Sequence, residues 1–96
     1  MSKEPHIDIL DESHTLTVEE LCERCRVEVT WVEEMVAQGV ISPVEGGRQF
    51  AEVTIRTVRT ARRLERDFAL NASGVALAMD LLSEIDRLKS ELRRRR

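Results

Sequence analysis

The chain has 96 residues, of which 42% are hydrophobic, 34% are charged and 3% are aromatic. This length allows one small domain with an aliphatic core, and a domain this small gains stability from a partner subunit. The sequence has no run of the roughly 18 apolar residues that a membrane span needs, and its first residues lack the apolar block of a signal peptide. We therefore expect a cytoplasmic protein with no membrane association and with free cysteine thiols.

Charge is divided unequally along the chain. Residues 1–55 hold four basic and twelve acidic side chains, a net charge of −8, whereas residues 56–96 have a net charge of +5. The overall charge of −3 therefore hides an acidic head on a basic tail.

The first two predicted elements are a short strand and a helix. Ile7 and Ile9 alternate with polar residues, which suits an edge strand over residues 5–10. Thr17 and Glu20 have the capping-box spacing, in which each side chain accepts from the backbone N–H of the other residue, so a helix is predicted to begin there. Its apolar residues are Val18, Leu21, Cys22 and Cys25, with Val27 in the following turn.

A second helix is predicted after a short break. Thr30 and Glu33 repeat the capping-box spacing, and Gly39 is expected to end the helix in the left-handed conformation. The apolar side of this helix consists of Val32, Met35 and Val36. Two short helices joined by a tight turn predict a helix-turn-helix.

The turn sequence at residues 45–48 lies between Ile41 and Phe50 and predicts a small hairpin of the kind called a wing. A third helix is expected over residues 52–68. Its predicted inward residues are Ile55, Val58, Ala61 and Phe68. Another face holds arginines three and four positions apart, namely Arg56, Arg59, Arg63 and Arg66.

The last predicted helix opens at Asn71 or Ser73, and its apolar residues recur at alternating steps of four and three. This heptad seam consists of Gly74, Ala78, Leu81, Ile85, Leu88 and Leu92, and Val75, Met79 and Leu82 are expected to contact the body. We predict a homodimer interface made by Leu81, Ile85, Leu88 and Leu92, because the seam extends beyond the part of the helix that the body can cover. The alternative is that the seam belongs to the core of its own chain. The expected division is an N-terminal segment (1–15), a body (16–70) and a coiled-coil-like C-terminal helix (71–96).

The order of these elements resembles the MerR-type winged helix-turn-helix, and a closer resemblance is to the chaperone-modulator (CbpM) family. The residues that carry it are Glu20-Leu21-Cys22, Val40-Ile41-Ser42-Pro43, Arg62-Arg63-Leu64-Glu65 and residues 70–78 and 80–88. The expected fold class is mainly α: a MerR-like winged helix-turn-helix with a C-terminal dimerisation helix. The resemblance implies a small protein that binds the J domain of a DnaJ-like, DNA-binding co-chaperone and restrains it.

Charge favours a protein partner over DNA. In a DNA reader the second helix enters the major groove among phosphates, but here that helix carries Glu33 and Glu34 and no basic residue. Like charges about 4 Å apart cost about 1 kcal/mol per pair in water, so we do not expect specific DNA binding. The resemblance implies a basic J-domain surface, and we predict that Glu28, Trp31, Glu33 and Glu34 contact it.

Two alternatives stay open at this point. Trp31 could pack on the wing of its own chain while the glutamates only solubilise the helix. The protein could instead be a MerR-like transcription regulator that contacts DNA through Arg48 in the wing and through the arginines of the third helix.

The remaining chemistry is sparse. Cys22 and Cys25 form a lone C-x-x-C inside a predicted helix, and His6 and His14 could complete a zinc set only if the N-terminal segment folded back, so structural cysteines are favoured. No cysteine or serine has a histidine base nearby in the sequence, and there is no phosphate-binding glycine loop. We therefore expect no enzymatic activity, no catalytic residue, no metal and no cofactor.

Overall fold

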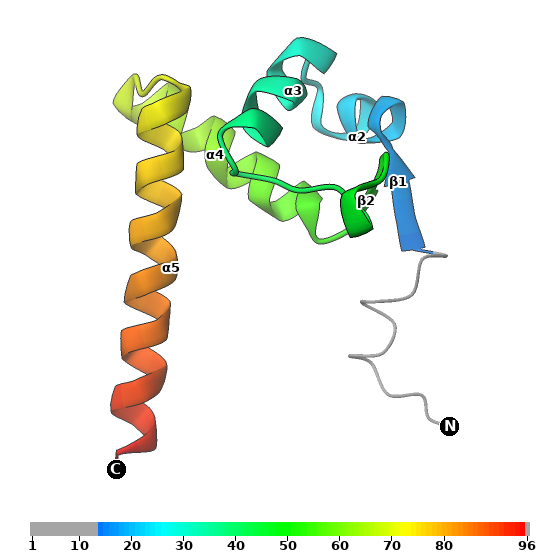
Figure 1. Cartoon of the computed structure of the whole chain (residues 1–96). Coiled ribbons are helices and arrows are strands. Elements are labelled where there is room, and N and C mark those ends of the chain that lie inside the picture. Colours follow the sequence, from blue (N-terminus) through cyan, green and yellow to red (C-terminus); the bar gives the residue numbers. More distant parts are fainter. Residues whose placement is uncertain (1–13, 96) are drawn as a thin grey trace, which may run out of the picture.

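A computed structural model describes residues 14–95 of the chain. Its elements are β1 (Thr15–Thr17), α2 (Val18–Cys25), α3 (Val29–Ala37), the 3₁₀ turn η2 (Val44–Gly46), β2 (Gln49–Ala51), α4 (Thr54–Phe68) and α5 (Ala72–Arg94). The elements from β1 to α4 gather in one body, and α5 runs away from it (Figure 1). The strand predicted for residues 5–10 lies outside the described residues.

The start of α2 follows from its sequence. The Thr17 hydroxyl accepts the Glu20 backbone N–H at 3.1 Å, and the Thr17 backbone N–H donates to the Glu20 carboxylate at 2.9 Å. The predicted capping box is therefore confirmed. Leu21 is fully buried, and α2 ends at Arg26, whose φ of 59° is left-handed although it is not a glycine.

The second predicted capping box is wrong. Helix α3 begins at Val29 with Glu28 as its N-cap, no side chain caps it, and Thr30 lies inside its first turn. Burial of Val32 and Met35, both at most 1% exposed, sets the position of this helix in place of a cap. The predicted end is confirmed, because Gly39 has a φ of 80° and directly follows the C-cap, Gln38.

The predicted wing hairpin is also wrong. Strand β2 pairs antiparallel with β1, with Leu16 opposite Phe50, and Ile41 lies in no strand. This pairing places two buried side chains, Leu16 and Phe50, on the core side of the sheet. The backbone N–H and C=O groups of β2 thus pair with those of β1, and this long-range pairing closes the body.

The core is aliphatic, as the composition predicted, apart from Phe50. It consists of Leu16, Leu21, Val32, Met35, Ile41, Phe50, Val58, Ala61, Ala72 and Val75. Every element from β1 to α5 contributes to it except η2. Phe68 was expected to point inward, but it is 66% exposed, because it is the last residue of α4 and the chain turns away at Ala69, whose φ is 56°.

Helix α5 is held to the body by its first two turns only. The Asn71 side chain accepts the Gly74 backbone N–H at 2.8 Å, which confirms Asn71 as the start of the helix. Val75 is fully buried and Met79 packs against the core, as predicted. Leu82 was also expected to contact the body, but this prediction is wrong, because its side chain is 42% exposed and does not pack against the core of its own chain. Beyond Met79 the helix projects from the body (Figure 1).

Within residues 14–95, no single helix is long and apolar enough to cross a membrane. The helices α4 and α5 reach the required length and hydrophobicity only when they are counted as one segment, and their axes are bent by 117° at the break between them.

Candidate functional site

The acidic surface consists of Glu28, Glu33 and Glu34, at the N-cap and in the middle of α3. All three side chains are exposed, and none forms an ion pair with another residue of the described range 14–95. Burial of Val32 and Met35 on the opposite side fixes the helix, so the carboxylates face solvent. The negative charge of α3 is therefore open to a partner and is not neutralised by the arginines of α4.

Trp31 is fixed between α3 and α4. Its indole N–H lies 2.9 Å and 3.1 Å from the two carboxylate oxygens of Glu65, and the Arg62 guanidinium lies 5.7 Å from the centre of the ring. Arg62 and Glu65 also form an ion pair at 3.5 Å. The polar and cation–π contacts of Trp31 are thus with α4, whereas the alternative reading placed this ring on the wing.

Three of the four predicted partner-binding residues line one shallow hollow. This α3 hollow has a volume of about 370 Å³ and is lined by Arg26, Val27, Glu28, Thr30, Trp31, Glu34 and Arg62. Glu33 is exposed on the same helix but is not part of the lining. The lining therefore combines the Trp31 ring with two carboxylates, Glu28 and Glu34, and with the guanidinium groups of Arg26 and Arg62, the second of which already lies over the ring.

Sequence reasoning missed the residues that position Trp31. Glu65 follows Trp31 by 34 positions, so no local pattern connects them. A usable signal was present nevertheless, because Glu65 is the one acidic residue among the arginines of residues 56–66. A single carboxylate in an otherwise basic segment is a candidate for a hydrogen bond or ion pair with another residue of the same chain.

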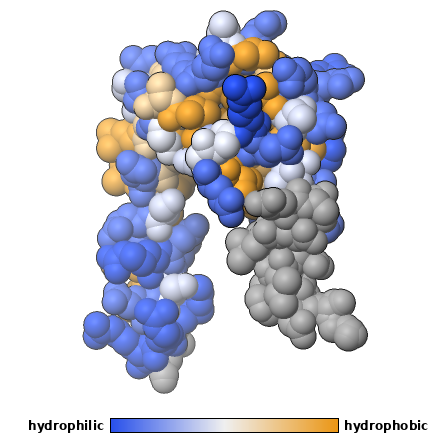
Figure 2. Space-filling model, turned by 45° about the vertical axis from the view of Figure 1, so that its right-hand side comes forward, coloured by the Kyte–Doolittle hydropathy of each residue, from blue (hydrophilic) through white to orange (hydrophobic). Residues whose placement is uncertain are grey.

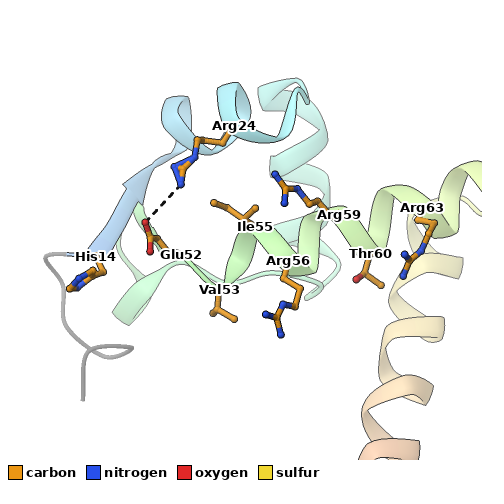
Figure 3. A pocket seen from close by; sticks show the side chains of 9 residues that line it. All are labelled: His14, Arg24, Glu52, Val53, Ile55, Arg56, Arg59, Thr60 and Arg63. Carbon is orange, nitrogen blue, oxygen red and sulfur yellow. Dashed lines mark ion pairs between the residues drawn. The ribbon is translucent and has the colours of Figure 1, made fainter. Parts of the chain in front are cut away.

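A second, larger hollow lies between α2 and α4. This arginine hollow has a volume of about 910 Å³ and is lined by His14, Arg24, Glu52, Val53, Ile55, Arg56, Arg59, Thr60 and Arg63 (Figure 3). Three residues of the predicted arginine stripe therefore meet at one place, together with Arg24 from α2. The fourth, Arg66, lies outside the hollow and pairs with Asp67 at 3.1 Å.

The two cysteines are free thiols and half-buried. Burial raises the pKa of the Cys22 thiol, and the nearby Glu19 carboxylate raises it further. Burial also raises the pKa of the Cys25 thiol, whereas Arg59 and Arg24 lower it in part. Within residues 14–95, no group of three or more histidine, cysteine or acidic side chains is placed to hold a metal ion.

The predicted dimer seam is exposed on α5. Leu81, Ile85, Leu88 and Leu92 are 45–65% exposed, so these side chains do not form part of the core of their own chain. In Figure 2 the visible side of the lower part of α5 is hydrophilic, while hydrophobic side chains gather on the body above it. The leucines thus occupy a limited part of an otherwise polar helix.

Comparison with known proteins agrees with the fold. The sequence profile of the family described as "MerR HTH family regulatory protein" matches residues 16–96. The chain is 35% identical over 81 residues to the chaperone modulatory protein CbpM of Pseudomonas entomophila (strain L48), which covers 79% of this chain and 78% of that protein. It is 37% identical over 82 residues to the chaperone modulatory protein CbpM of Salmonella arizonae, which covers 82% and 81% of the two chains. The chain therefore belongs to the chaperone modulatory protein CbpM family and has a MerR-type helix-turn-helix fold.

Proposed function

We propose that the protein modulates a DnaJ-like, DNA-binding co-chaperone by binding to its J domain through α3. The family name supports a chaperone-modulating role. The observation that carries the proposal is the acidic surface of α3, which is exposed and without internal ion pairs among residues 14–95. A basic surface on the J domain would match it in sign.

The α3 hollow supplies a specific contact within this surface. Glu28 and Glu34 flank Trp31, whose ring is already held by Glu65 and Arg62. A side chain that is fixed before binding loses little conformational freedom on association, so Trp31 is suited to act as an anchor. A lysine or arginine of the partner would enter between the two carboxylates and contact the ring.

The role that we propose is binding and not catalysis, in the cytoplasm and without a cofactor. The pKa values of both thiols are raised, which is the opposite of an activated nucleophile. The carboxylates of α3 are exposed, and an exposed carboxylate lacks the burial that would prepare it for proton transfer.

We further propose that two copies associate through Leu81, Ile85, Leu88 and Leu92 of α5. These four aliphatic side chains lie on one helix, and each is close to half exposed or more. Association would be favourable because a second helix that covers them removes apolar surface from water. The acidic surface lies on the body and not on α5 (Figure 1). Each copy of the dimer would therefore keep its own docking surface.

A MerR-like DNA-binding regulator is the second candidate, favoured by the family match and by the exposed arginines of α4. The absence of any basic residue from α3, residues 29–37, weighs against it. Duplex binding that prefers one sequence and weakens steeply with salt would favour this candidate.

The test of J-domain docking is charge reversal on α3. Glu33→Lys with Glu34→Lys should weaken binding of an isolated J domain at least about tenfold, because opposite charges at the interface become like charges. Isothermal titration calorimetry measures the affinity, and circular dichroism checks that the helices are intact.

The matched control is Glu19→Lys with Glu23→Lys, which makes the same charge change at exposed positions of α2. We expect this control to change the affinity by less than about twofold, since exposed charges outside the contact contribute little. An equal loss in the two variants would indicate attraction by overall charge, and no loss in either would contradict docking through α3.

A further inference from the structure

The arginine hollow contains positive charges that no side chain of residues 14–95 neutralises through an ion pair. Arg56, Arg59 and Arg63 are exposed, and none of them has an ion pair with a described residue. Their neighbours on the same helix differ, because Arg62 pairs with Glu65 at 3.5 Å and Arg66 pairs with Asp67 at 3.1 Å. The unpaired arginines of α4 are therefore those that line the hollow.

These three arginines begin on one side of α4, but their side chains diverge, and Figure 3 shows Arg59 extending upward from the helix and Arg56 downward. The three residues occupy positions i, i+3 and i+7, which lie on one side of an α-helix and span about 10.5 Å along its axis. Arg24 from α2 also lines the hollow, where it forms an ion pair with Glu52 at 3.9 Å with both side chains about half exposed, so this pair adds no net charge. Figure 3 shows Arg24 reaching toward Glu52 while the arginines of α4 come from successive turns.

Two apolar side chains also line the hollow, near Glu52 and Arg56 (Figure 3). Val53 is 56% exposed, Ile55 is half-buried, and both belong to the lining. The hollow thus combines unpaired guanidinium groups that can bind anions with a place for an aliphatic side chain. A ligand that fits must have several negative charges and an apolar group beside them.

We propose that the arginine hollow binds an extended acidic segment of a protein partner, with two or three carboxylates at alternate positions and a neighbouring aliphatic residue. Alternate side chains of an extended peptide lie about 6.6 Å apart on one face, whereas the arginines start about 4.5 Å and about 6 Å apart along the helix axis, so their long side chains would have to spread to meet the carboxylates. Guanidinium groups bind carboxylates with two parallel hydrogen bonds, so each arginine can hold one acidic side chain.

The same observations disfavour nucleic acid as the ligand. The imidazole of His14 is the one ring in the lining, and no phenylalanine, tyrosine or tryptophan lines the hollow, so unpaired bases have little on which to stack. Glu52 places a carboxylate in the lining, and the described part of the head, residues 14–55, has eight acidic and three basic residues, which would repel a long polyanion that reached it. A short peptide avoids that surface.

This site is separate from the α3 hollow and does not depend on the proposed J-domain contact. None of its lining residues belongs to α3. The Glu33→Lys with Glu34→Lys variant is therefore expected to bind the acidic peptide as the unmodified protein does, and failure of one proposal leaves the other standing.

The test uses a fluorescein-labelled ten-residue peptide with three glutamates at alternate positions followed by a leucine, and fluorescence anisotropy of the full chain. Arg59→Gln with Arg63→Gln should weaken peptide binding at least about tenfold, since two charge-assisted contacts are lost. The control, Arg66→Gln with Arg94→Gln, removes the same charge at exposed positions outside the hollow and should change the affinity by less than about twofold.

Melting temperatures of both variants within a few degrees of the unmodified protein would show that the fold is intact. The proposal is overturned if the peptide does not bind at millimolar concentration, or if the two double variants weaken binding equally. It is also overturned if a twelve-base-pair duplex at the same salt concentration binds more tightly than the peptide and loses that binding in the Arg59→Gln with Arg63→Gln variant.

Discussion

At the scale of single residues, the arginines of the hollow also affect a thiol. Burial raises the pKa of Cys25, and among the charged groups that lower it Arg59 has the largest effect. The pKa of Cys22 has no such arginine among its causes, and Glu19 raises it. The two cysteines, three positions apart on α2, therefore have different charged groups around them, although Cys25 is itself among the causes that raise the pKa of Cys22.

This difference gives a prediction for Arg59→Gln. Without the positive charge the pKa of Cys25 rises further, so a smaller fraction of the thiol is ionised at pH 8, and alkylation by iodoacetamide slows by about twofold to threefold. The rate at Cys22 should stay the same. Mass spectrometry of the two cysteines measures both rates in one sample, with Arg66→Gln as the control; equal slowing at Cys22 and Cys25 would contradict the assignment.

At the scale of elements, the two threonines with capping-box spacing provide a matched pair. Thr17 caps α2 through its hydroxyl, whereas Thr30 lies inside α3 and is exposed. Thr17→Ala should lower the free energy of unfolding by about 1 kcal/mol, because the Glu20 backbone N–H loses its partner.

Thr30→Ala removes no cap and places a better helix former in α3, so we expect it to be neutral or slightly stabilising, by less than about 0.7 kcal/mol. Urea unfolding followed by circular dichroism measures both variants. Equal destabilisation by the two substitutions would show that the hydroxyl of Thr17 has no special role.

The same contrast explains how much of the fold could be predicted from the sequence. Features that depend on neighbours within one helical turn were predicted correctly, such as the Thr17 cap, the left-handed Gly39 and the Asn71 cap. Thr30 has an equally good local pattern, but the start of α3 is decided by burial of Val32 and Met35. Local preference contributes less free energy than core packing, so packing prevails where the two disagree.

Contacts between distant segments were beyond local patterns. The pairing of β1 with β2, the bond from Trp31 to Glu65 and the position of Arg24 beside α4 each join separate elements. The turns after α2 and α4 rely on Arg26 and Ala69 in the left-handed conformation, which sequence reasoning assigns to glycine or asparagine. Charge and residue type were therefore enough to name candidate site residues from the sequence. The hollows that these residues line could be identified only in the structure.

At the scale of the whole molecule, the body and α5 carry different surfaces. The body has the acidic surface on α3 and the arginine hollow between α2 and α4, and α5 presents aliphatic side chains beyond its contact with the body. Such side chains contribute about 1.5–3 kcal/mol each when they leave water. The four on α5 are 45–65% exposed, so a second copy would bury only part of each, and their burial must also exceed the cost of association. The dimer that we propose requires a net gain of about 8 kcal/mol at micromolar concentration.

Ile85→Glu with Leu88→Glu tests this arrangement, because it places two negative charges in the middle of the seam. Sedimentation equilibrium should then show a monomer, whereas the unmodified protein sediments as a dimer at micromolar concentration. Ser83→Glu with Ser90→Glu adds the same charge on the opposite side of α5 and should leave the dimer intact. A monomeric unmodified protein, or dissociation of both variants, would contradict association through these leucines. Since the acidic surface belongs to the body, the monomeric variant should bind an isolated J domain with unchanged affinity per chain, which separates self-association from docking.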